Sequence, residues 1–417
     1  MDRRREYETQ RGSMTREERE AYREWKERQK EHQKYRREKE KESWELAHGP
    51  IDLPFCLLVL LLTAIGLVML LSASFPSAYY ETKNNNPAYY FIRQGVFAIA
   101  GISLMFFIGK LNYQRFRGAA KFLLLAAFVL LVLVLIPGIG QTRNNATRWI
   151  GIGQLLTFQP SEVAKLAVIV YFSDSISRKK DKMRTTRYGI APYLLILGIF
   201  SILMLLEPHL SGTVLIVGVG AVLMLVGGIR WFWVAIAGVG VGGVAALMMS
   251  GIITYGQSRI AMWKDPFIDP RGDGYQLSQS LISIGSGGLL GVGLGKSRQK
   301  FLYLPEEHND FIFAIICEEL GLIGATIIML LFAALILRGY WIALHARDRF
   351  GSLLVVGVTT LIAMQTFLNI GVVTGLLPTT GISLPFFSYG GTALLIQLAE
   401  MGIVLSVSRQ MKPTKAG

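Results

Sequence analysis

The residues best suited to chemistry lie at 303–321, in the stretch YLPEEHNDFIFAIICEELG. An acidic segment at 305–310 leads directly into an apolar run that itself contains Glu318 and Glu319. If that run is helical, a rise of ~1.5 Å per residue places these two carboxylates roughly 12 Å beyond Asp310. Carboxylates at a membrane surface or within a span are costly, and they therefore indicate function. We interpret Asp310 as a catalytic base; the alternative is an aspartate that only caps the following helix.

The composition is that of a membrane protein. Of the 417 residues, 52% are hydrophobic and only 17% are charged, and the 44 glycines suit close packing of helices in lipid. A net charge of +14 would also suit nucleic acid, but the basic residues fall mostly between apolar runs. Membrane topology explains them better, and we expect no nucleic-acid partner. Cys56 and Cys317 lie within apolar segments, where neither a disulfide nor a metal site is indicated.

Three regions follow from the distribution of charge. Residues 1–47 form a charged tail, which we expect to be cytoplasmic and partly helical or disordered, because Glu and Lys or Arg recur three and four residues apart. It is either a solvated extension or a docking segment for a partner or anionic lipid, using Trp25 and Trp44. Residues 48–410 form the membrane domain and 411–417 a short basic cytoplasmic tail. The first apolar run starts only near Ile51, so no cleavable signal peptide is predicted.

The membrane domain is predicted to be all-α, with about ten transmembrane helices of the length that a bilayer requires. They are expected at 52–73, 91–109, 118–137, 160–175, 189–206, 211–228, 230–250, 311–337, 351–375 and 391–408. Lys and Arg collect at both ends of the chain and in every second loop, which places both termini in the cytoplasm. The large loop 251–310, between the seventh and eighth spans, then faces the outside.

The segment GSGGLLGVGLGKS at 285–297 resembles a phosphate-binding loop but fails its spacing, because Leu290 stands where that motif needs glycine. One interpretation is a set of glycine-permitted re-entrant turns that pack this loop against the helices. The other is a phosphate-facing loop, in which Lys296, Arg298 and Lys300 supply the charge.

The outside loop at 143–159 and the start of the next span are also polar. Arg143 and Arg148 are basic residues on the side that the positive-inside rule disfavours. Trp149 is either an interfacial anchor or part of a site. Glu162 and Lys165 are three residues apart and share a helix face, so they either pair with each other or line a cavity for an anionic substrate.

Two further outside segments complete the set. In EPHLSGT at 207–213, Glu207 and His209 are interpreted as turn and cap residues, with catalysis as the alternative. In 376–400, prolines and glycines indicate a re-entrant turn that offers the Ser388 hydroxyl, and Glu400 lies deep in the last span without an evident partner. Because all four polar outside loops meet the same membrane face, the catalytic interpretation of Asp310 is favoured.

Four motifs, in order along the chain, resemble the SEDS family, which includes FtsW, RodA and SpoVE proteins. They are TRWIGIGQLLTFQPSEVAK (147–165), YQLSQSLISIGSGGLLGVGLGKSRQKF (275–301), YLPEEHNDFIFAIICEELGLIG (303–324) and GLLPTTGISLPFFSYGG (375–391). The resemblance covers about 50–410. It implies a ten-helix glycosyltransferase of the bacterial cytoplasmic membrane, which polymerises lipid II into peptidoglycan glycan strands at the outer face of that membrane. It also implies a partner, a class B penicillin-binding transpeptidase.

The resemblance places the family's essential aspartate on Asp310, as a general base or as a ligand of a divalent cation (Mg²⁺ or Mn²⁺). The other residues that the family's motifs share fall on Glu162, Lys165, Arg148 and Trp149. Cations near the pyrophosphate leaving group favour the transition state, and Arg93 and Lys296 are further candidates. We also assign substrate binding to His308 and Ser388. Members often read QPDLGT at 207–213, and because His209 replaces their aspartate we carry no role to it.

Two other functions remain open on the sequence. One is a transporter that flips lipid II, which needs polar residues at both membrane faces. The other is a scaffold that only positions a transpeptidase, which needs neither Asp310 nor the pair formed by Glu162 and Lys165.

Overall fold

The computed structural model describes residues 20, 22, 24–35, 49–82, 85–143, 146–152, 156–230, 232–233, 235–236 and 257–411. The chain divides into two compact units, Met1–Gly49 and Pro50–Gly417. In the first unit, residues 24–35 are helical, and Arg28 pairs with Glu24 one turn away at 3.0 Å. The remainder of the predicted tail, including Trp44, lies outside the described residues, as does 412–417.

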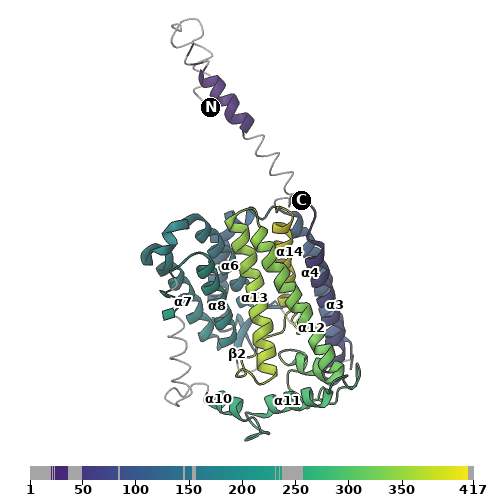
Figure 1. Ribbon diagram of the computed structural model, residues 1–417. Coiled ribbons are helices and arrows are strands. Elements are labelled where there is room, and N and C mark those ends of the chain that lie inside the picture. The colour runs from purple at the N-terminus through teal and green to yellow at the C-terminus, as the bar shows by residue number, and fades with distance from the viewer. Residues whose placement is uncertain are drawn as a thin grey trace. The chain divides into compact units, whose positions relative to one another are not determined.

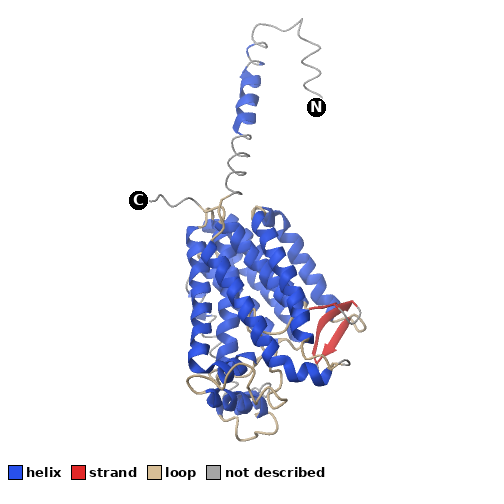
Figure 2. Cartoon of the chain, turned by 90° about the vertical axis from the view of Figure 1, so that its right-hand side faces the viewer, coloured by secondary structure: helices blue, strands red, loops and turns tan. Residues whose placement is uncertain are grey.

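The second unit is a bundle of long helices with a small sheet (Figures 1 and 2). Its elements are α3 (Leu53–Glu81), α4 (Tyr89–Lys110), α5 (Arg115–Val134), β1 (Gly140–Arg143), β2 (Ala146–Ile152), β3 (Leu156–Phe158), α6 (Pro160–Lys179), the short turns of helix η1 (Lys180–Arg184) and η2 (Thr186–Ile190), α7 (Ala191–Leu206), α8 (Leu210–Val226), α10 (Gln257–Lys264), α11 (Tyr275–Gly287), α12 (Ile312–His345), α13 (Arg349–Val373) and α14 (Gly391–Ser408).

Among the described residues, seven helical segments are long and apolar enough to cross a membrane. They are α3, α4, α5, η2 with α7, α12, α13 and α14, and each overlaps one of the predicted spans. The predicted fourth span falls on α6, which is less apolar because it contains five charged residues, and the sixth falls on the shorter α8. The predicted seventh span, 230–250, lies almost entirely outside the described residues.

The expectation of an all-α chain is wrong for the segment between α5 and α6. Strands β1, β2 and β3 form a three-stranded antiparallel sheet in the order β1-β2-β3. Gln141 pairs with Trp149, and Ile150 in turn pairs with Phe158. Short strands with Thr, Ile and Trp favour this pairing, which is too local to show as a long apolar run. Figure 2 places the sheet toward the end of the bundle where the long loops lie.

Helix α12 is broken at Gly321, whose φ of 68° and ψ of −172° are not helical. The glycine-rich segment after α11 fills the break with main-chain hydrogen bonds. The N–H groups of Val292 and Gly293 donate to the carbonyls of Glu318 and Glu319 at 2.9 and 3.0 Å. Non-helical backbone within a membrane requires this kind of partner. The expected packing of 285–297 against a helix is therefore confirmed, while its re-entry into the membrane stays a prediction.

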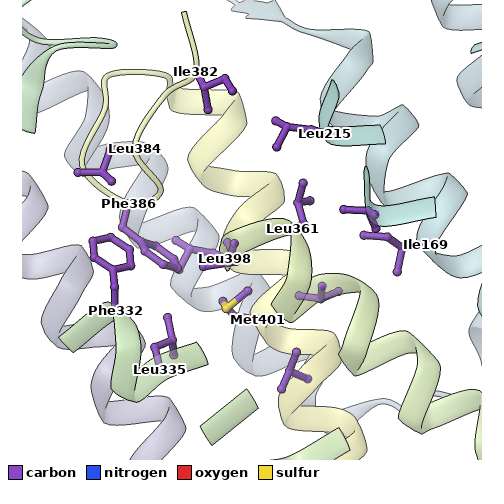
Figure 3. Close-up of a cluster of buried hydrophobic side chains, with 14 of the residues drawn as sticks. Ile169, Leu215, Phe332, Leu335, Leu361, Ile382, Leu384, Phe386, Leu398 and Met401 are labelled. Atoms are coloured by element: carbon purple, nitrogen blue, oxygen red, sulfur yellow. The ribbon is translucent and has the colours of Figure 1, made fainter. Parts of the chain in front are cut away.

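The apolar core joins the helices to the loop at 376–390. Figure 3 shows buried side chains of α6, α8, α12, α13 and α14 meeting others from that loop. Phe386 is 2% exposed, and its ring stacks against that of Phe332 on α12 with centroids 6.4 Å apart. Ile382 and Leu384 are buried as well. The core therefore fixes the loop against α12, and Nδ2 of Asn369 joins the loop to Asp310 by donating to the carbonyls of both Ile382 and Asp310.

Candidate active site

Asp310 lies in a tight turn immediately before α12. The N–H groups of Asn309 and Phe311 both donate to the carbonyl of Glu306, at 3.0 and 3.3 Å. Asn369 on α13 donates through Nδ2 to the carbonyl of Asp310 at 2.7 Å. The N-cap of α12 is Phe311, with no side-chain capping bond, so the Asp310 carboxylate does not cap the helix. The hypothesis that Asp310 is only a helix cap is wrong.

The Asp310 carboxyl group faces the loop at 376–390 and is surrounded by charged groups. A Cβ atom placed on Gly381 would lie 3.2 Å from Oδ2 of Asp310, so only glycine leaves this approach open. Burial raises the pKa of Asp310 to about 6, and the negative charge of Glu306 adds to this, while Arg148 and His308 oppose it. At neutral pH the group is mostly ionised yet more basic than an ordinary aspartate, which suits a general base.

His308 is held in place by aromatic rings and a carboxylate. The ring of Tyr90 stacks on it with centroids 4.7 Å apart, and the N–H of Tyr389 donates to its carbonyl at 2.9 Å. Its Nδ1 lies 3.3 Å from a carboxylate oxygen of Glu307, which also accepts a hydrogen bond from the Ser77 hydroxyl. Burial alone would lower the pKa of His308, but the neighbouring carboxylates, Glu307 above all, raise it overall. The ring therefore retains its second proton to higher pH than an ordinary histidine does.

Ser388 ties the loop at 376–390 to the turn that carries Asp310. Its hydroxyl donates to the carbonyl of Asn309 at 2.8 Å and accepts from the N–H of Leu384 at 2.7 Å. Its carbonyl accepts from Nε2 of Gln94 on α4 at 3.3 Å. The hydroxyl is therefore engaged within the protein, and a contact with substrate stays a prediction.

Arg148 is held by main-chain carbonyls of the turn between α7 and α8. Its Nε donates to the carbonyl of Glu207 at 3.4 Å, and its Nη2 donates to that of Pro208. This contact explains how a basic residue is retained in this loop. Trp149, beside it on β2, is half-buried, and both of its interpretations remain predictions. The side chain of Arg143 lies outside the described residues.

Glu162 and Lys165 form a buried ion pair in the first turns of α6. Nζ of Lys165 lies 2.8 Å from the Glu162 carboxylate, and the two residues are 3% and 8% exposed. The expected pairing is confirmed. Lys165 also interacts electrostatically with His209 and with Glu400 on α14, so the pair belongs to a larger buried polar cluster. A contribution to substrate binding stays a prediction.

Two further predicted cations, Arg93 and Lys296, are not among the described charges that shift the pKa of Asp310. Arg93 donates to the hydroxyl of Tyr89 at 3.2 Å on α4. Lys296 is exposed, and within the described parts of the chain it has no hydrogen bond or ion pair to a residue of the Asp310 turn. Lys300 does not face a phosphate, because it is buried and pairs with Glu319 at 2.9 Å. The carboxylates within α12 therefore serve the packing of the glycine-rich segment.

Sequence reasoning undervalued Glu207, His209 and Glu400. Glu207 is the C-cap of α7 and His209 the N-cap of α8, so their interpretation as turn and cap residues is confirmed, although the side chain of His209 makes no capping bond. Glu207 is fully buried, and Glu400 is 1% exposed. The signal in the sequence was an ionisable residue beside or within an apolar run. Such a residue is expected to have a role, but the sequence does not identify its partner.

The arrangement brings the Asp310 carboxylate, the cations Arg148 and Lys165, and several buried hydrogen-bond acceptors to one end of the bundle. The described residues contain no group of three or more His, Cys, Asp or Glu side chains that could hold a metal ion. A divalent cation held by Asp310 stays a prediction. A carboxylate that accepts a proton beside cations that favour an anion suits the displacement of an anionic leaving group by a hydroxyl.

Comparison with known proteins identifies relatives over nearly the whole second unit. A family model described as "Cell cycle protein", which covers FtsW, RodA and SpoVE, matches residues 53–413. Stage V sporulation protein E of Bacillus subtilis is 45% identical over 359 residues, which are 86% of this chain and 97% of that protein. The probable peptidoglycan glycosyltransferase FtsW of Geobacter metallireducens is 42% identical over 371 residues, covering 87% and 96%.

Solved structures agree with these sequence relatives. A chain from a peptidoglycan synthase complex, described as coordinating polymerization and crosslinking, has a TM-score of 0.73 at 27% identity and covers 88% of this chain and 99% of that one. The rod shape determining protein RodA of Thermus thermophilus has a TM-score of 0.64 at 28% identity, with the same coverage.

Proposed function

Because this chain belongs to the FtsW, RodA and SpoVE family of cell cycle proteins, we propose that it polymerises lipid II into the glycan strands of peptidoglycan. It is a multi-pass protein of the bacterial cytoplasmic membrane and a peptidoglycan glycosyltransferase. The single observation that carries the mechanism is Asp310, a carboxyl group of raised pKa with Arg148 among the charges that act on it.

In the proposed reaction, the sugar 4-hydroxyl of the acceptor attacks C1 of the donor. A new C1–O bond forms as the bond from C1 to undecaprenyl pyrophosphate breaks, and the hydroxyl proton passes to Asp310. Direct displacement inverts the anomeric carbon and converts an α-linked donor into a β-linked polymer. Asp310 then releases its proton to solvent before the next cycle, which its pKa of about 6 permits at neutral pH.

The leaving pyrophosphate gains negative charge as the bond to C1 breaks. Arg148 and Lys165 are the cations that we assign to it, because both lie in the cluster of charges around the turn at 207–209. Glu162 orients Lys165 through the buried pair. We give His308, Trp149, Arg93 and Lys296 secondary roles along the substrate path. A divalent cation (Mg²⁺ or Mn²⁺) on the pyrophosphate is the alternative role for Asp310, and the rate would then depend on added cation.

We propose that the end of the bundle that carries Asp310 faces the outside of the membrane and that both termini are cytoplasmic, with about ten crossings in all. The distribution of Lys and Arg supports this orientation. The similar chain from a peptidoglycan synthase complex supports a class B transpeptidase as partner, which would cross-link the strands that this chain makes. The charged tail at 1–47 is a candidate docking segment.

The test is polymerisation of lipid II by the purified protein, alone and with its transpeptidase, followed as glycan strands on a gel. We expect strands of many disaccharides, and a larger amount with the partner present. If the pair makes no polymer from lipid II but moves it across vesicle membranes, the proposal fails and the transporter is favoured.

A further inference from the structure

The turn between α7 and α8 contains two buried ionisable side chains that the proposed mechanism does not use. Glu207 is 0% exposed and His209 is 7% exposed. Within the described part of the chain, neither carboxylate oxygen of Glu207 has a hydrogen-bond partner, and neither does Nδ1 of His209. The His209 ring lies over Gly212, where a Cβ atom would come within 2.7 Å of it. Both side chains are thus packed into the interior without the partners that buried polar groups normally have.

The same turn holds Arg148, but through its main chain. The guanidinium donates to the carbonyls of Glu207 and Pro208 and forms no ion pair with the adjacent Glu207 carboxylate. A carboxylate beside a guanidinium ordinarily forms a charge-assisted pair, often bidentate. An uncharged Glu207 is compatible with this arrangement, because the neutral acid exerts no such attraction on the guanidinium.

The electrostatic surroundings agree with an uncharged pair of side chains. Burial raises the pKa of Glu207 to about 8, against the opposing effect of Arg148. Burial, with Arg148 and then Lys165, lowers the pKa of His209 to about 3. The charged groups that act on the turn are Arg148 from β2 and Lys165 from α6, and the carboxyl groups of Glu162 on α6 and Glu400 on α14 lie beside Lys165 in the same cluster. Near neutral pH, Glu207 is the acid and His209 the neutral imidazole.

We propose that Glu207 is a positioning residue that acts through Arg148: its uncharged acid form leaves the guanidinium directed toward Asp310 and an anionic leaving group. When Glu207 ionises, the carboxylate draws the guanidinium into an ion pair and withdraws its charge from the reaction. The turn at 207–209 thereby sets an upper pH limit for catalysis. This inference depends on the proposed glycosyl transfer, because the anionic leaving group belongs to that reaction.

The first test is the pH dependence of polymerisation by wild type and by Glu207→Gln, each normalised to its own maximum. Glutamine is a permanent mimic of the uncharged acid. Wild type should lose rate above the pKa of about 8, falling to roughly a tenth one pH unit higher. Glu207→Gln should keep its rate to higher pH. The control is Asp273→Asn, which removes an exposed carboxylate in the loop before α11 and should behave as wild type.

An identical alkaline limb in wild type and Glu207→Gln would overturn the proposal, even though polymerisation itself succeeds. A second measurement needs no catalysis and separates this failure from that of the proposed function. Infrared spectra of the wild type in membranes should contain the carbonyl stretch of a buried protonated acid at about pH 7 that is lost by about pH 9. Glu207→Gln should lack this change. If the wild type shows no such change, Glu207 does not titrate as proposed and the inference is wrong.

Discussion

Single residues carry the chemistry, and the raised pKa of Asp310 makes a prediction about acid pH. The base must be ionised to accept a proton, so the rate should rise with pH through the pKa of about 6 and then level off. Below this pKa each pH unit should cost about tenfold in rate. The measurement is the initial rate of lipid II consumption across this range. A rate that stays flat down to about pH 4.5 would show that Asp310 has an ordinary pKa.

Variants of the buried pair on α6, Glu162 and Lys165, can separate an effect on stability from an effect on catalysis. Lys165→Met leaves the charge of Glu162 buried without its cation, which typically costs about 3–5 kcal/mol of stability. The double variant Glu162→Gln with Lys165→Met removes both charges and should recover most of that loss, but not the rate. Thermal unfolding in detergent and polymerisation of lipid II measure the two effects. Recovery of the rate together with the stability would exclude a role for Lys165 in the reaction.

The candidate residues at this scale were largely predictable because charge is conspicuous in an apolar sequence. Asp310, Arg148, Glu162 and Lys165 all stood out in that way. The pairing of Glu162 with Lys165 was also predictable from their spacing, but partners distant in sequence were not. The carbonyls that hold Arg148 belong to a turn about sixty residues away, and such contacts leave no pattern in the sequence.

At the scale of elements, long apolar runs predicted the helices well, because a bilayer fixes their length. The sheet at 140–158 was missed because its strands are three to seven residues long and follow no long alternation. The break in α12 was missed as well, since an isolated glycine in an apolar run does not reveal positive φ. Both irregular elements flank the proposed site residues in sequence: the sheet directly precedes Glu162, and the break follows Asp310.

The break in α12 predicts a strong effect of Gly321→Ala. The substitution forces a side chain into a left-handed conformation with φ of 68°, where its Cβ would lie 2.3 Å from the N atom of Gly291. We expect a loss of at least about 1–3 kcal/mol, measured as a lower unfolding temperature. The matched control is Gly285→Ala in α11, where a Cβ meets no atom within 4 Å. Equal unfolding temperatures for the two variants would show that the break does not depend on glycine.

At the scale of the whole molecule, the two ends of the second unit meet at one end of the bundle. The N–H of Asp52 donates to the Ser408 hydroxyl at 3.2 Å, and the carboxylate of Asp52 pairs with Arg338 at 2.7 Å. A chain whose two ends lie on the same side of a membrane crosses it an even number of times, which agrees with the proposed ten crossings. The positive-inside rule supplied the orientation from sequence, while the path through 230–256 lies mostly outside the described residues.

Topology can be tested with a membrane-impermeant thiol reagent in a background that lacks Cys56 and Cys317, both of which are buried. Asp273→Cys and Arg347→Cys place thiols at exposed positions in loops at opposite ends of the bundle. In intact spheroplasts, Asp273→Cys should react and Arg347→Cys should react only after permeabilisation. The reverse result would invert the proposed orientation and place Asp310 in the cytoplasm.

The most direct measurement is polymerisation of lipid II by purified Asp310→Asn, compared with wild type and with Asp273→Asn, each in the presence of the transpeptidase. Asparagine keeps the size of the side chain but cannot take a proton, so we predict a loss of at least about 100-fold. Asp273→Asn should retain the wild-type rate, and all three proteins should unfold at similar temperatures. A folded Asp310→Asn protein that makes polymer at the wild-type rate would show that Asp310 is not the base.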